Sequence, residues 1–149
     1  MLVITQPPGS AAQDARTAGF EAELKEKFTG LEYLGPQYQS DDPQKAAEIV
    51  TSTLSAHPDL AGIFATNDQG AIGAITGLRQ AGAASNVKVV AYDAATAEVN
   101  AFKNGTIHAL IAQNLKQEGE IAMEAAAKLI EGGYARKYDA HRTRHDQGW

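Results

Sequence analysis

Residues 63–73 read IFATNDQGAIG, and the order of apolar and polar residues in this segment is the strongest indication of the fold. It passes from a short apolar run to the polar pair Asn67-Asp68, and then to small residues with Ile72 at helical spacing. A buried strand that ends in polar side chains and leads directly into a helix is typical of an open α/β sheet. In such sheets, ligands bind in the crevice outside the carboxyl ends of the strands. We therefore expect Asn67 to face a ligand.

The alternation of strand and helix continues on both sides of this stretch. Apolar runs predict strands at 2–5, 61–66, 87–92 and 108–112. A less regular extended segment includes Leu31 and Tyr33, and Tyr38 is a further candidate beyond the interruption at Gly35-Pro36. Apolar residues three and four apart predict helices at about 10–28, 43–56, 70–81, 96–103 and 116–131. Strands that alternate with helices through short loops indicate βαβ units. We predict an α/β fold: a three-layer, doubly wound parallel sheet with helices on both faces.

Two helix starts carry recognisable signals. Ser10 is expected to cap the first helix, and the run Ser40-Asp41-Asp42-Pro43 places an aspartate at the cap of the second, with proline in its first turn. The sequence Gly70-Ala-Ile-Gly73 is interpreted as a place where helices pack closely, because it lacks the rest of a nucleotide-binding motif.

Size and composition limit the classes of protein that fit. A chain of 149 residues with 44% hydrophobic and 21% charged residues suits one globular domain. The net charge of −5 and the scattered basic residues argue against a nucleic-acid surface. The absence of cysteine excludes disulfides and thiolate chemistry. No apolar run reaches the length of a membrane helix, and the strand-like residues directly after Met1 predict that this chain carries no signal peptide.

Four polar residues stand where this fold would place a ligand. Asn67, Asp93 and Gln113 each follow an apolar strand, and neighbouring strands lie about 4.8 Å apart, so their side chains should meet at one edge. Arg16, early in the first helix, should reach the same crevice. A guanidinium, a carboxylate and two carboxamides donate and accept hydrogen bonds but include no strong nucleophile. This set suits a polyhydroxylated ligand such as a sugar.

The alternative for each residue at a strand end is helix capping, which Asn and Asp commonly perform. We assign Asp68 and Thr66 to capping rather than to ligand binding.

The sequence carries no recognisable catalytic motif. GxSxG, P-loop and GxGxxG motifs are absent, so we expect no enzyme and no cofactor, with a doubly wound enzyme of unknown reaction as an alternative. His141 and His145 lie four residues apart and could share a helix face that binds a metal. They fall in the charged tail 134–149, which we expect to be loosely ordered, so no metal site is predicted.

Three longer segments resemble a known family: PGSAAQDARTAGF (8–20), GIFATNDQGAIGAITGLRQAG (62–82) and VVAYDAATAEVNAFKNGTIHALIAQN (89–114). Together with the alanine-rich final helix, they resemble the C-terminal lobe of ribose-type sugar-binding proteins. These are the type I periplasmic binding proteins that serve ABC importers as solute receptors. The resemblance covers about residues 2–133.

The resemblance implies a two-lobed parent protein that closes on a monosaccharide at a hinge. It implies that residues 1–133 are the C-terminal sugar-binding lobe, that the N-terminal lobe is absent from this chain, and that Arg16, Asn67, Asp93 and Gln113 bind sugar hydroxyls. The parent protein would be periplasmic, with an ABC permease as its partner.

Two further expectations follow from the resemblance. The uncovered hinge face of a single lobe favours self-association, so a homodimer through that face is expected. The alternative function within the same fold is the effector-binding domain of a lactose-repressor-like transcription regulator. This chain carries no DNA-binding helices, so we favour the transport receptor.

Overall fold

The computed structural model describes residues 1–133, which divide at residue 113 into two compact units. The first unit contains every strand and the first four helices, and the described part of the second contains the last helix. In chain order the elements are β1 (Leu2–Thr5), α1 (Ala11–Lys27), β2 (Pro36–Tyr38), α2 (Pro43–Ala56), β3 (Gly62–Ala65), α3 (Asp68–Gln80), β4 (Lys88–Tyr92), α4 (Thr96–Lys103), β5 (Ala109–Ile111) and α5 (Leu115–Ile130).

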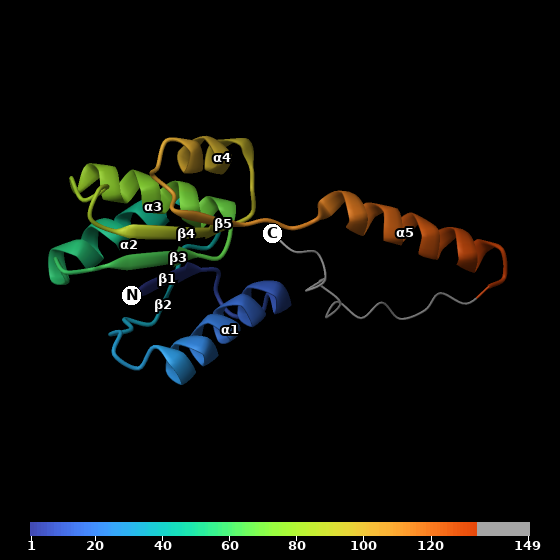
Figure 1. The fold of residues 1–149 in the computed structure, drawn as a ribbon, viewed down its shortest axis with the longest axis horizontal. Helices are drawn as coiled ribbons and strands as arrows, with labels where there is room; N and C mark the ends of the chain where they lie inside the picture. Colours follow the sequence, from blue (N-terminus) through green and yellow to red (C-terminus); the bar gives the residue numbers. More distant parts are fainter. Residues whose placement is uncertain (134–149) are drawn as a thin grey trace. The chain divides into compact units, whose positions relative to one another are not determined.

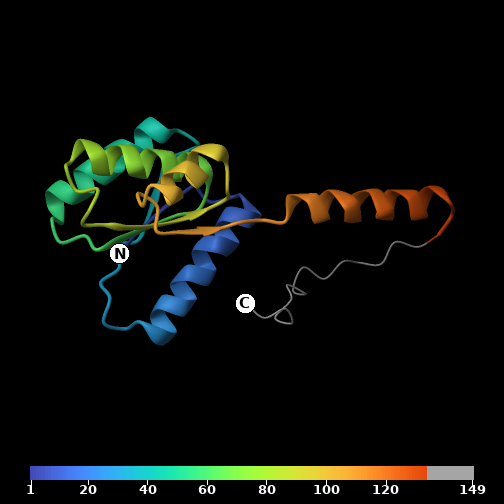
Figure 2. The same ribbon diagram turned by 45° about the horizontal axis from the view of Figure 1, so that its top comes forward.

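The five strands form one parallel sheet in the order β2-β1-β3-β4-β5. Helices α2, α3 and α4 cover one face, and α1 lies on the other, as Figures 1 and 2 show from two directions. The strand order reverses after β2, and right-handed crossovers then place helices on opposite faces. The predicted three-layer, doubly wound α/β fold is confirmed.

The main core lies between the sheet and α2, α3 and α4. Side chains alternate along each strand, so Ile63 and Ala65 of β3 point into this core, together with Val89 and Ala91 of β4. Helices α2 and α3 approach closely through glycines. A Cβ atom on Gly77 would lie 2.6 Å from the Ala47 carbonyl oxygen, and one on Gly73 would overlap Ala46 and Pro43. The interpretation of this segment as a helix-packing surface is confirmed.

The opposite face packs against α1 through aromatic rings. The Phe20 ring stacks on the ring of Phe64 with centroids 5.3 Å apart, and the centroids of the tilted pair Phe20 and Tyr33 are 5.9 Å apart. Stacked and tilted aromatic pairs at these separations stabilise a contact beyond their buried area. They hold α1 beside β3, and this position brings Arg16 toward the carboxyl ends of the strands.

Two local predictions were wrong in part. The second strand includes the candidate Tyr38 but not Leu31 or Tyr33; it begins at Pro36 and pairs only with β1. Proline has no N–H to donate, and it is tolerated here because it is the first residue of an edge strand. Ser10 occupies the N-cap position of α1 but its side chain makes no capping hydrogen bond. Instead, Asp14 accepts a hydrogen bond from the Gly9 N–H at 3.0 Å.

The second unit is described by α5, which agrees with the helix predicted at 116–131 to within a residue at each end. Asn114 caps it by accepting a hydrogen bond from the Gln117 N–H at 3.2 Å. At the other end, the Gly133 N–H donates to the Lys128 carbonyl. In residues 1–133, no helix has both the length and the apolar content needed to cross a membrane. The expectations for the tail 134–149, including His141 and His145, fall outside the described residues.

Candidate functional site

The carboxyl ends of β3 and β4 are level with each other, because Ala65 lies opposite Ala91 in the sheet register. Asn67 and Asp93 therefore stand two residues beyond the same level on neighbouring strands. Gln113 follows β5, in which Ile111 lies opposite Tyr92. The sheet thus places three of the predicted residues side by side along one edge.

Asn67 is almost fully buried, with 5% of its surface exposed, and it caps α3. Its Oδ1 accepts hydrogen bonds from the Gly70 N–H and from Gln39 Nε2, both at 3.0 Å. Its Nδ2 donates to Asp41 Oδ1 at 2.8 Å. The capping alternative is therefore realised by Asn67 itself. Asp68 is the first residue of α3, and its carboxylate accepts from the N–H of Gln69.

Asp93 and Gln113 form a direct pair at the ends of β4 and β5. Gln113 Nε2 donates to Asp93 Oδ1 at 2.5 Å, and the Asp93 N–H donates to the Ile111 carbonyl at 2.9 Å. Asp93 has a φ of 89°, a conformation that residues other than glycine rarely adopt. The short hydrogen bond to a charged acceptor fixes the carboxylate against this backbone. Asp93 is partly buried and Gln113 is exposed, and the Asp93 Oδ2 accepts no hydrogen bond from the described residues.

Arg16 connects the ends of two strands. Its Nη1 donates to the Thr66 carbonyl at 2.8 Å, and its Cζ lies 3.5 Å from the centroid of the Tyr92 ring. Thr66 precedes Asn67 and Tyr92 precedes Asp93, so the guanidinium lies beside both predicted ligand residues. A guanidinium has five N–H donors, and the bond to Thr66 occupies one of them. The cation–π contact with the Tyr92 ring holds the guanidinium in place without using any of its N–H groups.

Several residues of this edge were not predicted from the sequence. Gln6 and Gln39 follow β1 and β2, and they join Asp41 in the hydrogen bonds around Asn67. Their position after strands is the same signal that identified Asn67. Asp41 was instead assigned to the start of α2, where Asp42 is the residue that caps the helix, with Pro43 in its first turn. Tyr92 ends the strand predicted at 87–92, and its contact with Arg16 is not marked by any local pattern.

Glu98 is a buried carboxyl group behind Asp93. It has no exposed surface, and its Oε2 accepts from the Ala95 N–H at 2.9 Å at the start of α4. Its Oε1 has no hydrogen-bond partner among the described residues. Burial raises the pKa of Glu98 above its ordinary value; the hydrogen bond from Ala95 opposes the rise, and the nearby carboxylates of Asp93 and Asp68 add to it.

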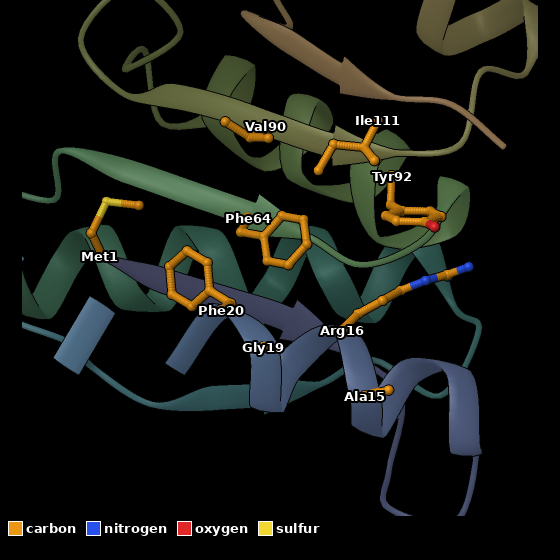
Figure 3. A pocket seen from close by; sticks show the side chains of 9 residues that line it. All are labelled: Met1, Ala15, Arg16, Gly19, Phe20, Phe64, Val90, Tyr92 and Ile111. Atoms are coloured by element: carbon orange, nitrogen blue, oxygen red, sulfur yellow. The ribbon is translucent and has the colours of Figure 1, made fainter. Parts of the chain in front are cut away.

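An apolar cavity lies between α1 and the sheet, with a volume of about 330 Å³ (Figure 3). Its lining includes Phe20, Phe64, Val90 and Ile111, and Arg16 is the only one of the four predicted site residues among them. An apolar lining offers a polyol no hydrogen bonds. The polar edge is therefore the better candidate for the functional site, and the cavity ends beside it at Tyr92.

The chemistry of this edge is that of a receptor for hydroxyl groups. It combines carboxylate and carboxamide acceptors with amide and guanidinium donors, and hydroxyls pair with both kinds. Within residues 1–133, no group of three or more His, Cys, Asp or Glu side chains is arranged to hold a metal ion. An open parallel sheet with such groups at its carboxyl edge defines a ligand-binding α/β domain.

Comparison with known proteins identifies the family. A family model described as "Periplasmic binding protein domain" matches residues 1–133, and the chain belongs to this family. Ribose import binding protein RbsB of Salmonella typhimurium is 36% identical over 125 residues, which are 83% of this chain and 41% of that protein. The D-ribose/D-allose-binding protein of Pseudomonas aeruginosa is 32% identical over 117 residues, or 78% of this chain and 36% of that protein.

Solved structures agree with this assignment. An ABC transporter solute binding protein from Agrobacterium vitis with bound D-fucose has a TM-score of 0.84 and 29% identity, over 91% of this chain and 47% of that one. An ABC transporter periplasmic solute binding protein from Actinobacillus succinogenes with bound D-allose has a TM-score of 0.83 and 29% identity, over 91% and 50%. These relatives are binding proteins rather than enzymes. The chain spans less than half the length of the curated relatives it matches.

Proposed function

We propose that this chain is a sugar-binding lobe: one half of a solute receptor of an ABC importer, corresponding to the C-terminal lobe. The observation that supports this most is the pair Asp93–Gln113, with its hydrogen bond of 2.5 Å, at the same sheet edge as Asn67 and Arg16. In this proposal, Asp93 accepts from sugar hydroxyls, while Arg16, Asn67 and Gln113 donate to sugar oxygens. The reaction is binding and release without catalysis.

The parent protein in this proposal is periplasmic. It contains an N-terminal lobe that closes over the sugar, and it delivers the sugar to an ABC permease. The relatives named above are import proteins for ribose, or bind ribose and allose, and the solved structures hold fucose or allose. A neutral monosaccharide is therefore the proposed ligand. By itself, the lobe is proposed to form a homodimer through its uncovered hinge face, and sedimentation velocity that shows only monomer at all concentrations would contradict this.

The direct test is an NMR titration of the full chain with D-ribose, D-allose and D-galactose at up to high millimolar concentration. Binding should shift the side-chain amide signals of Asn67 and Gln113 and the backbone signal of Asp93. The variant Asp93→Asn should bind the same sugars at least tenfold more weakly, because it removes the charged acceptor. Shifts confined to other surfaces, or none with any sugar, would refute the proposed function.

A further inference from the structure

The Asn67 side chain has little left to offer a ligand as an acceptor. A carboxamide oxygen has two lone pairs, and Asn67 Oδ1 already accepts from the Gly70 N–H and from Gln39 Nε2. One N–H of its Nδ2 is directed to Asp41. What remains is a single N–H donor. A sugar hydroxyl that needs an acceptor at this position must find it on a different residue.

Asp41 lies beside the Asn67 side chain and can supply the missing acceptor. Its Oδ1 accepts from Asn67 Nδ2 at 2.8 Å and from Gln6 Nε2 at 2.6 Å, so side chains that follow β1 and β3 both hold it. Asp41 is exposed, and its Oδ2 accepts no hydrogen bond from the described residues. Ser40 and Asp41 have φ values of 58° and 59°. This left-handed turn brings the carboxylate from the end of β2 to the side chain of Asn67.

We propose that Asp41 is a specificity-determining residue of the sugar site, a proposal that rests on the function proposed above. Asp41 Oδ2 accepts a ligand hydroxyl at the point where Asn67 can only donate. The sheet edge then carries two carboxylates, each held by a carboxamide: Asp41 by Asn67 and Asp93 by Gln113. A ligand that fits must present hydroxyl donors to both.

The charges around this edge narrow the class of ligand. Asp42 and Asp68 follow β2 and β3 next to Asp41 and Asn67, and Arg16 is the one cation placed among the site residues. A ligand anion would be repelled by these carboxylates, whereas an uncharged ligand would not. The proposed ligand is therefore an uncharged sugar or cyclitol, or one that bears an ammonium group. Sugars with a carboxylate or a phosphate should bind more weakly than their uncharged counterparts.

The test compares the full wild-type chain with Asp41→Asn, Asp41→Gly and a control, Asp59→Asn. Asn and Gly both accept the left-handed conformation of residue 41, so these variants should fold. Asp59 is exposed and precedes β3, at the opposite end of the sheet, so its variant changes the net charge equally without touching the site. Each protein is titrated by NMR with D-ribose, D-allose and D-galactose, and with D-galacturonate as the anionic counterpart of galactose.

The expected result has two parts. Both Asp41 variants bind the neutral sugars at least tenfold more weakly than wild type, and the preference for galactose over galacturonate falls severalfold. Asp59→Asn matches wild type in both respects. The change in preference separates a contact with ligand from a role in positioning Asn67 alone, because loss of positioning would weaken both sugars equally.

Two outcomes would overturn the proposal while leaving the proposed function intact. The first is neutral sugars binding to the Asp41 variants as tightly as to wild type; the second is weaker binding with an unchanged preference for galactose. If no sugar shifts the Asn67, Asp93 or Gln113 signals of the wild-type chain, the proposed function itself fails, and the role of Asp41 fails with it.

Discussion

At Asp93, an unfavourable backbone conformation accompanies a well-held side chain. The φ of 89° brings the carboxylate to Gln113, and the strain is offset by hydrogen bonds from Gln113 and to Ile111. Strained residues of this kind cluster at functional sites. The nearby Glu98 carries a second cost, because one of its buried carboxyl oxygens has no hydrogen-bond partner in residues 1–133, which is destabilising. Both features belong to single residues and can be tested one at a time.

Replacing Asp93 separates the backbone from the carboxylate. Asp93→Ala and Asp93→Gly both remove the charged acceptor, so neither should bind sugar. Only glycine removes the strain, since a left-handed conformation costs a residue with a Cβ atom about 1–2 kcal/mol. The free energy of unfolding of Asp93→Gly should therefore exceed that of Asp93→Ala by about 1 kcal/mol in urea denaturation. Equal stabilities would show that the backbone at residue 93 is relaxed.

The raised pKa of Glu98 makes the stability of the protein depend on pH. The pKa of Glu98 in the folded protein is raised above its ordinary value of 4.5, so folding favours the protonated form. The contribution of protonated Glu98 to the free energy of unfolding is complete below about pH 4.5, and it is lost as the pH rises through the raised pKa. Glu98→Gln, which stays neutral, should become more stable relative to wild type as the pH rises from 4 to 7. Denaturant unfolding across this range measures the difference.

The control for this pH series is Glu48→Gln, an exposed glutamate of α2. Its stability should follow that of wild type across the range. If the free energy of unfolding of wild type and of Glu98→Gln changed with pH in the same way, burial would not disfavour the charged form of Glu98, and the prediction would be wrong.

At the scale of elements, the close contact between α2 and α3 determines how these helices pack on their face of the sheet. Gly77 faces the Ala47 carbonyl oxygen, and a Cβ atom there would also lie 2.8 Å from the Val50 Cβ. Asn67 caps the same α3 helix, so the packing of α3 and the position of a ligand-facing side chain are linked through one element. A shift of α3 would move both.

Gly77→Ala should therefore destabilise the protein by about 1–3 kcal/mol, the usual cost of overpacking a well-filled core. The matched control is Gly19→Ala in α1, where an added Cβ meets nothing within 4 Å. That change should stabilise by roughly 0.5–1 kcal/mol, because alanine is the better helix former. Thermal and urea unfolding of both variants test the pair. A neutral effect of Gly77→Ala would show that α2 and α3 can move apart freely.

At the scale of the whole molecule, the length of the chain matters most. It corresponds to less than half of the length of its relatives. Small-ligand sites usually bury about 70–90% of the ligand surface. In the proposed function, one lobe supplies one side of that enclosure, so the hydrogen bonds it offers remain in competition with water.

The chain alone should therefore bind monosaccharides with a dissociation constant well above the micromolar range. Isothermal titration calorimetry with ribose, galactose and xylose should show little or no heat at micromolar protein concentration, although NMR detects binding at millimolar sugar. A micromolar or tighter constant from calorimetry would contradict this expectation, and would indicate that a single lobe encloses its ligand.

Much of the fold could be predicted because its signals are local. The alternation of apolar runs and helical spacing gives strands and helices whose bounds agree with the structure to within a few residues, and a polar residue directly after a strand stands at the carboxyl edge whatever the strand order. The second strand was predicted to begin too early, at Leu31, and of the predicted residues only Tyr38 belongs to it. Pro36–Tyr38 is short and irregular, and only its pairing with β1 makes it a strand.

The class of fold and the sheet edge that carries Asn67, Asp93 and Gln113 follow from hydrophobic periodicity and from the position of each residue directly after a strand. Which side chains contact one another at that edge depends on how the strands and helices pack. The strand order β2-β1-β3-β4-β5 and the left-handed turn at Ser40-Asp41 bring Asp41 to Asn67, and the packing of α1 brings Arg16 over Tyr92. These contacts join residues at least 26 positions apart, so no local pattern encodes them.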